Sequence, residues 1–219
     1  MNVFDIIGPV MIGPSSSHTA GAVRIGKIAG ALLGSTPVFA HILLHGSFAK
    51  TYKGHGTDKA LVAGIMGMTP SDVRIRESLQ IANERGLDVV FEKAEIQGAH
   101  PNTAVITLKD AMGRTVTVRG ASVGGGNIVI SEINGLQVDI TGQQTTLLIL
   151  HRDVPGVIAQ VTNYIASQGV NIGNFKLSRN HRGDTALMTI EVDGDFSTKS
   201  NEGIEKMPNV MQSIILQPS

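Results

Sequence analysis

A run of six expected elements in the last third of the chain restricts the fold more than any other feature. Pro155 suits the first turn of a helix, and Val157, Val161 and Tyr164 follow with helical spacing up to Gly169. The expected elements are a strand over 147–150, that helix, strands over 170–178 and 186–192, a helix over 197–207 and a strand over 210–216. This βαββαβ order predicts a ferredoxin-like sandwich.

The first 140 residues predict an α+β arrangement with helices early and a meander of strands late. Ile25, Ile28, Ala29 and Leu32 give the first helix an apolar face that ends at Gly34. Further helices are expected over 58–66 and 73–84, and strands over 38–44, 89–91, 103–109, 114–119 and 127–133. The polar segment 141–146 indicates a linker, so we expect one domain over residues 1–142 and a second over 143–219.

Composition excludes several classes of function. The 219 residues include no cysteine, so this chain has no disulfide, no thiolate nucleophile and no cysteine ligand for a metal cluster. Basic and acidic residues number 18 each, and the resulting zero net charge disfavours nucleic acid and acidic membranes as partners. The N-terminus does not resemble a signal peptide, and no apolar run is long enough to span a bilayer. We therefore expect a cytoplasmic protein.

Residues 13–19, Gly-Pro-Ser-Ser-Ser-His-Thr, stand directly before the first helix. Free N–H groups at a helix N-terminus, together with several hydroxyl groups, suit the binding of an anion. The candidate residues are Ser15, Ser16, Ser17, His18 and Thr19. Simple N-capping by one serine is the alternative, but capping needs only one such residue.

A second polar group lies between residues 45 and 58. It contains His45, Lys50, His55 and Thr57, with His55 between two glycines. Each histidine by itself also fits a plain structural role at a strand end or in a turn. Together they favour a polar site, and the excess of Lys and Arg over Asp between residues 24 and 59 suits a small carboxylate ligand.

The sequence gives weaker support to two other kinds of site, a zinc site and a phosphate-binding loop. The histidines have no H-E-x-x-H spacing and no neighbouring carboxylate to orient them, which disfavours zinc. The segment Gly124-Gly-Gly-Asn127 lacks the pattern of a phosphate-binding loop, and a glycine bulge between strands is its alternative interpretation.

The C-terminal half resembles an ACT domain, a regulatory module that usually binds amino acids between paired copies. The resemblance rests on His151-Arg-Asp-Val-Pro-Gly-Val157 and on Gly169-Val-Asn-Ile-Gly173. A Pro-Gly helix start offers backbone N–H groups to a carboxylate, and Asp153 suits an ammonium group. The ligand residues implied are His151, Asp153, Gly156, Val157, Asn171 and Ile172. Alternatively, Pro155 and Gly156 only shape the turn and Asp153 caps the helix.

Taken end to end, the chain resembles the beta subunit of iron–sulfur-dependent L-serine dehydratases. The motifs are GPSSSHT, HGSFAKTYKGHGTDKA and GGGN, followed by the ACT domain. The resemblance implies an N-terminal domain like the allosteric-substrate-binding domains. It also implies a cysteine-containing alpha subunit that ligates a [4Fe–4S] cluster, which would explain the absence of cysteine from this chain.

The family reaction converts L-serine to pyruvate and ammonia, with an open iron site acting as Lewis acid on the leaving hydroxyl. The resemblance makes His18, His45 and His55 the candidates for the base that removes the α-proton. It implies substrate binding by Ser15, Ser16, Ser17, Thr19, Lys50, Thr57 and Asn127. Serine or a monovalent ion at the ACT interface would regulate the enzyme, and a homodimer through either domain is expected.

Two rival functions remain open. One is a stand-alone amino-acid sensor, and the other is a regulatory fragment of an enzyme such as 3-phosphoglycerate dehydrogenase. The SSSHT and GHGTD segments discriminate between the functions, because a purely regulatory domain would need neither.

Overall fold

A computed structural model describes residues 12–13, 15–179 and 181–218 of the chain. Its internal contacts divide the chain into two compact units, Met1–Gly135 and Leu136–Ser219. Both units combine helices with sheets, as the α+β prediction required. No helix in the described part is long and apolar enough to cross a membrane.

The sheet of the N-terminal unit has β3 at its centre. Its strands are β1 (Pro37–Leu44), β2 (Asp88–Lys93), β3 (Thr103–Asp110), β4 (Thr115–Gly124) and β5 (Asn127–Ile133), in the spatial order β2-β1-β3-β4-β5. β1 and β2 are parallel, and the remaining neighbours are antiparallel. The parallel pair requires a long crossover, and the helical segments between the two strands supply it.

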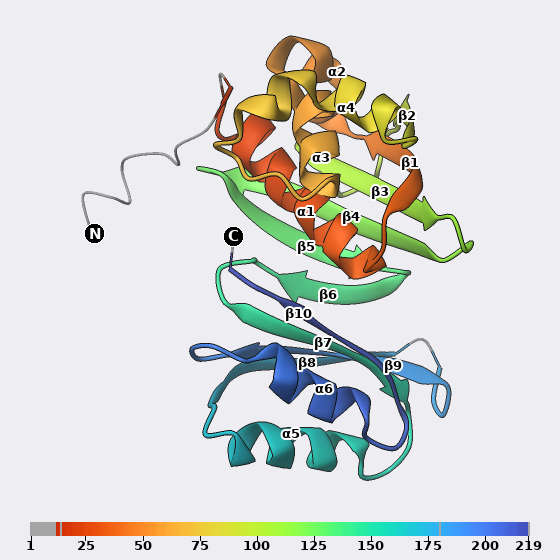
Figure 1. Ribbon diagram of the computed structural model, residues 1–219, viewed down its shortest axis with the longest axis vertical. Helices are drawn as coiled ribbons and strands as arrows, with labels where there is room; N and C mark the ends of the chain where they lie inside the picture. Colours follow the sequence, from red (N-terminus) through yellow and green to blue (C-terminus); the bar gives the residue numbers. More distant parts are fainter. Residues whose placement is uncertain (1–11, 14, 180, 219) are drawn as a thin grey trace, which may run out of the picture. The chain divides into compact units, whose positions relative to one another are not determined.

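The helices of this unit cover one face of the sheet (Figure 1). They are η2 (Ser17–Gly21), which continues into α1 (Ala22–Leu33), then α2 (Gly46–His55), α3 (Thr57–Ile65), η3 (Val73–Glu77) and α4 (Ser78–Glu84). Gly26 of α1 and Gly64 of α3 lie against the opposite helix backbone, where a Cβ atom would overlap a carbonyl oxygen. On the sheet side, Gly120 of β4 leaves room for Ile25. Glycine at these contacts lets α1 approach both partners closely.

The C-terminal unit begins with β6 (Leu136–Ile140) and continues as the predicted sandwich. The later elements are β7 (Thr145–Arg152), α5 (Val157–Ser167), β8 (Ile172–Arg179), β9 (Thr185–Val192), α6 (Thr198–Glu205) and β10 (Val210–Leu216). The four-stranded sheet has the order β10-β7-β9-β8, so β8 is an edge strand. Both helices pack on one face, with Val161 and Ile165 of α5 fully buried in the core. The predicted βαββαβ order is confirmed.

Two elements were not predicted from the sequence. β6 follows a turn at Asn134 and Gly135, both of which have positive φ. α2 occupies a segment with two glycines and little apolar character, in which only Phe48 and Ala49 are buried. The N–H of Ser47, in its first turn, donates to the carbonyl oxygen of Pro101 at 2.7 Å. This satisfaction of a free helix N–H by a distant segment is invisible to local sequence patterns.

Candidate functional site

The helix that carries the SSSHT segment begins with a π-helical turn. The N–H of Gly21 donates to Ser16 O at 3.0 Å, a hydrogen bond that spans five residues, and the turn runs directly into α1. Such π turns are rare and occur often at functional sites. The N-cap residue, Ser16, makes no side-chain cap bond, whereas Ser15 Oγ accepts the backbone N–H of His18 at 3.4 Å. Ser15 also contacts the ring of His18.

Three hydroxyl groups surround the imidazole of His18, which is 8 % exposed. Its Nδ1 lies 3.3 Å from Ser15 Oγ, and its Nε2 lies 3.1 Å from Thr51 Oγ1 and 3.3 Å from Ser47 Oγ. The Thr51 hydroxyl donates to Ser47 O at 2.9 Å, so toward His18 it serves as an acceptor. This network assigns the proton of a neutral His18 to Nε2 and leaves Nδ1 to accept from Ser15.

His55, the last residue of α2, stands against His18. The two rings meet edge to face with centroids 4.7 Å apart and an angle of 87°. Phe48 packs on His18 at 5.2 Å. Burial lowers the pKa of His18, and the neighbouring charge of His55 lowers it further. His18 consequently takes up its proton at a lower pH than a free histidine does.

A cavity of about 350 Å³ opens beside His55. Its lining residues are Ile12, Gly13, Thr19, Lys53, Gly54, His55, Gly56, Lys59, Ile75 and Arg76. Thr19 is 2 % exposed, and its hydroxyl has no hydrogen-bond partner among the described residues. An unsatisfied buried hydroxyl is costly unless a ligand or water completes it, which marks this cavity as a candidate binding site.

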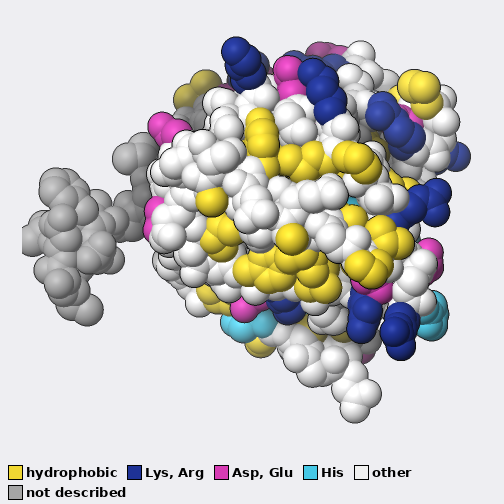
Figure 2. All heavy atoms as spheres, turned by 90° about the horizontal axis from the view of Figure 1, so that it is seen from below, with side chains coloured by type: hydrophobic (Ala, Val, Ile, Leu, Met, Phe, Trp, Pro, Cys, Tyr) yellow, Lys and Arg dark blue, Asp and Glu magenta, His cyan; other side chains and the backbone are white. Residues whose placement is uncertain are grey.

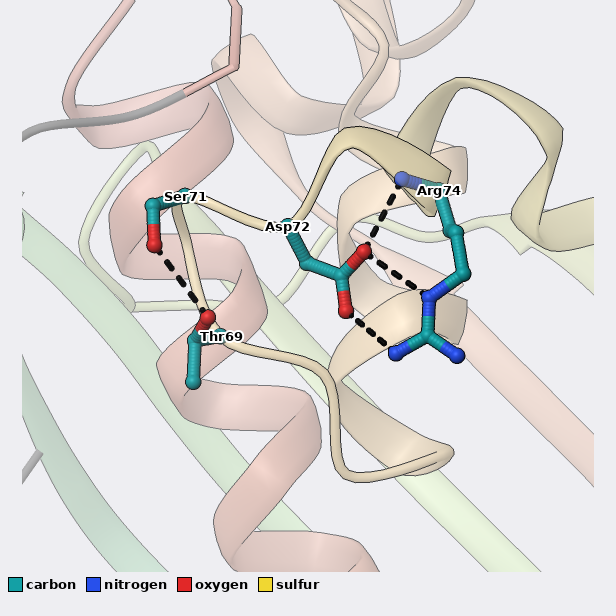
Figure 3. Close-up of polar contacts among 4 residues, drawn as sticks. All are labelled: Thr69, Ser71, Asp72 and Arg74. Carbon is teal, nitrogen blue, oxygen red and sulfur yellow. Dashed lines mark hydrogen bonds and ion pairs between the residues drawn. The ribbon is translucent and has the colours of Figure 1, made fainter.

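One wall of the cavity is the η3 turn, and a local ion pair holds its start. Asp72 accepts the backbone N–H of Arg74 at 2.9 Å and pairs with its guanidinium at 2.6 Å, while Thr69 and Ser71 join hydroxyls just before it (Figure 3). The hydrogen bonds from Arg74 lower the pKa of Asp72 to about 2. The pair fixes the start of the turn that carries Ile75 and Arg76 to the cavity.

Several other predicted substrate residues lie outside the lining of this cavity. Thr57 is fully buried at the start of α3, and its hydroxyl has no partner in the described part of the chain. Ser16 and Ser17 are half-buried in the first turn, and Lys50 is exposed on α2. None of these residues is among those that line the cavity.

His45 is held by another segment. Its Nδ1 accepts the N–H of Ile96 at 3.1 Å and lies 3.6 Å from the carboxylate of Glu95. Among the described contacts of His45, none involves His18 or His55. The structure thus brings two of the three predicted histidines together and ties the third to the loop after β2.

The glycine loop before Asn127 lies beside the N-terminal helix. Arg24 Nη1 donates to Gly126 O at 2.7 Å, and all three glycines of the loop have positive φ. Gly21 packs closely on Ser122 of β4. No sequence pattern marks Arg24 or Ser122 as contact residues. Ser47 and Thr51 were not predicted either, although they share one face of α2 with His55 at a spacing of four residues.

In the C-terminal unit, Asp153 is already satisfied within the chain. Its Oδ2 accepts from the N–H of Gly183 at 3.0 Å and from Arg179 Nη1 at 2.8 Å. These hydrogen bonds lower the pKa of Asp153, and the one from Gly183 has the largest effect. Asp153 does not cap α5: the N-cap is Gly156, with φ of 93° and no side-chain bond. That alternative interpretation of Asp153 is wrong.

The remaining predicted ACT residues lie at two ends of the sheet. Arg152 pairs with Thr185 at one end, while Ile172 pairs with Val192 at the other. His151 is 1 % exposed and its Nε2 has no described partner, and a cavity of about 620 Å³ runs along Asp153 and Gly156. Asn171, at the opposite end, donates to Asp193 Oδ2 at 2.7 Å. Within one chain, the predicted ligand residues near Asp153 and those near Asn171 therefore do not form one site.

Fold and site define a class: a two-unit protein in which a histidine-bearing α+β unit precedes a ferredoxin-like module. Residues 2–84 match the model of the serine dehydratase beta chain family, and residues 147–212 match that of an acetohydroxyacid synthase small-subunit-like ACT domain. The chain is 45 % identical to a probable L-serine dehydratase beta chain of Bacillus subtilis, over 96 % of both chains. It belongs to the L-serine dehydratase beta-chain family, and the resemblance seen in the sequence is confirmed.

Two further relatives frame this assignment. The L-serine dehydratase beta chain of Peptoniphilus asaccharolyticus is 37 % identical, over 88 % of this chain and 87 % of its own. A D-3-phosphoglycerate dehydrogenase of Mycobacterium tuberculosis is 27 % identical over 78 % of this chain but only 33 % of its own. The likeness to the dehydrogenase, anticipated as a rival, is thus weaker and confined to a part of that enzyme.

Proposed function

We propose that this chain is the beta subunit of a two-chain L-serine dehydratase that converts L-serine to pyruvate and ammonia. The observation that carries the proposal is the paired His18 and His55 beside a cation-lined cavity. In the reaction, the α-proton and the hydroxyl of serine leave as water. The resulting aminoacrylate tautomerises to an imine, and hydrolysis of the imine consumes one water and gives pyruvate and ammonia.

In this proposal His55 accepts the α-proton and His18 positions it. His55 lines the cavity, whereas His18 is buried behind it with both ring nitrogens hydrogen-bonded. A neutral, oriented imidazole at the edge of His55 leaves that ring free to take up a proton, which a charged neighbour would oppose. His45 stays a prediction as a base, since its described contacts lie elsewhere.

The iron–sulfur cluster would belong to a partner alpha subunit. This chain has no cysteine, and its described residues contain no group of three or more His, Asp or Glu side chains suited to a metal. The residues present therefore do not fit a cluster, and what this chain contributes is substrate binding and proton transfer. That the chain is inactive alone and works in the cytoplasm are parts of the same proposal.

For regulation, we infer that two copies pair through β8 and bind an amino acid between them. β8 is an edge strand, so only one side of it has a neighbour in its own sheet, and Phe175 on this strand is 37 % exposed. Antiparallel pairing about a twofold axis would bring the Asn171 end of one copy to the Asp153 end of the other. Figure 2 shows hydrophobic side chains at the surface on the side where α5 lies. Val154 and Ile158 are each 39 % exposed.

The test is anaerobic co-expression with a cysteine-containing alpha subunit, followed by a pyruvate assay on L-serine. We expect activity only in the complex, and a loss of at least about a hundredfold in kcat for His55→Ala, a typical share for a general base. His41→Ala is the matched control, because His41 is a surface histidine of β1 paired with Glu92. Serine binding without pyruvate formation in any complex would instead favour the stand-alone sensor.

A further inference from the structure

Three cations line the wall of the His55 cavity, and none of them forms an ion pair with a described residue. Lys59 projects from α3 and Arg76 from η3, and neither forms an ion pair with any described residue. Two neighbouring cations have other contacts among the described residues. Asp72 engages Arg74, and Lys53 lies over the ring of Tyr52, with its Nζ 5.8 Å from the ring centroid. Lys59 and Arg76 are therefore the charges in this wall that are left for a ligand.

The rest of the lining favours an anion. No Asp or Glu side chain lines the cavity, so nothing in its described wall neutralises Lys59 or Arg76. Thr19 adds a buried hydroxyl without a partner, and Gly54 and Gly56 leave the backbone beside His55 uncovered by side chains. A volume of about 350 Å³ suits a small molecule rather than a peptide. The wall is thus built from separate elements that converge on one small space.

We propose that Arg76 and Lys59 form a carboxylate subsite, with Arg76 as the residue that determines specificity for the free α-carboxylate. The inference rests on the proposed function, since it names the end of the substrate that this cavity holds. A guanidinium matches a carboxylate with two parallel hydrogen bonds, and Lys59 adds a point charge. The hydroxyl of Thr19 completes the donors. With the carboxylate there, the α-carbon of the amino acid faces His55.

This assignment differs from what the sequence alone suggested. The local excess of positive charge between residues 24 and 59 includes Lys59, but the predicted substrate residue was Lys50, which is exposed on α2 and does not line the cavity. Arg76 lies outside that stretch of sequence, and η3 brings it to the cavity. The subsite should accept small monocarboxylates that carry an α-amino group and reject the corresponding amides, which have no negative charge.

The first test measures binding to the full chain by NMR with two probes, L-serine and L-serinamide. The amide keeps the ammonium and hydroxyl groups and lacks only the carboxylate. We expect L-serine to shift the signals of residues 54–56 and 76, and L-serinamide to bind at least tenfold more weakly. Arg76→Gln should weaken L-serine binding about ten- to a hundredfold, as for a lost hydrogen bond to a charged group, and leave L-serinamide unchanged.

Arg85→Gln is the matched control, because Arg85 is an exposed arginine at the end of α4 outside this cavity. Arg76→Lys should restore part of the affinity. Equal weakening of both probes by Arg76→Gln, no effect of the substitution, or no shift at these residues with L-serine would each overturn the inference.

The pyruvate assay on the assembled enzyme separates this inference from the proposed function. Discrimination between the probes without pyruvate formation would retain the subsite and reject the dehydratase. Pyruvate formation with kcat/KM unchanged in Arg76→Gln would retain the dehydratase and reject the subsite.

Discussion

The His55 cavity and the Asp153 turn are both polar sites at the start of a helix, yet they differ in how far the chain satisfies them. Beside the cavity, the Thr19 hydroxyl is buried without a described partner, and the lining cations form no ion pair with a described residue. At the turn, Asp153 accepts from Arg179 and Gly183 and has a lowered pKa. The first site leaves polar groups without described partners within one chain, whereas the carboxylate of the second is satisfied by internal hydrogen bonds.

This difference separates two kinds of function. A substrate site must offer unsatisfied groups in advance, because their satisfaction by the substrate contributes to binding and orientation. A regulatory site can remain incomplete in one chain and form only when copies pair, which couples ligand binding to assembly. The opposite ends of the sheet at which Asp153 and Asn171 lie fit the second pattern.

The largest expected effect that tests the comparison comes from His18. In the assembled enzyme, His18→Gln keeps a donor toward Thr51 but removes the ring beside His55. In the proposed mechanism His18 positions the base without touching substrate, so we expect kcat for L-serine to fall about ten- to a hundredfold while KM changes less than about threefold. Steady-state kinetics measure this split. If Asp153→Asn lowered kcat as much, the functional separation of the two sites would fail.

The two sites should also respond to pH in different windows. The lowered pKa of His18 means that the unfolded chain binds this proton more readily, so stability decreases as the pH falls below about 6.5. Asp153 contributes stability above the ordinary carboxyl pKa, and this contribution is lost as the pH falls through its lowered value. Urea denaturation from pH 8 to pH 3 measures both. His18→Gln should reduce the pH dependence of the free energy of unfolding only in the range just below about pH 6.5, and Asp153→Asn should reduce it only in the acidic carboxyl range. A change in the other range for either variant would contradict the directions of the two pKa shifts.

The sequence predicted those parts of the fold that depend on local chemistry. The turn at residues 110–113 is an example: Asp110 accepts the N–H groups of Met112 and Arg114, both at 2.9 Å. Burial alone would raise the pKa of Asp110, but hydrogen bonds from Ser35 and Arg114 lower it to about 2. Such a turn is encoded within five residues, and its prediction needed no tertiary information.

The site was predicted only in part because α2 was missed. His18 and His55 were found by residue type, but the hydroxyls that orient them come from Ser47 and Thr51. Those two residues and His55 are four apart, so a predicted helix would have placed all three on one face. The start of α2 depends on a hydrogen bond to Pro101 O, and the cavity is closed on one side by residues of η3. A local sequence pattern does not encode either of these contacts between distant segments.

The smallest effect on stability, and the sharpest on regulation, is expected from Asn171→Ala. The bond of Asn171 to Asp193 is exposed, so its loss should change the free energy of unfolding by less than about 0.5 kcal/mol. If Asn171 completes a site on a second copy, however, added amino acid should no longer change the fraction of dimer in this variant. Sedimentation of the full chain with and without L-serine measures this, and Asn163→Ala on the exposed face of α5 is the control. A destabilisation above about 1 kcal/mol with an intact serine response would assign Asn171 a structural role and leave the Asp153 turn without its proposed counterpart.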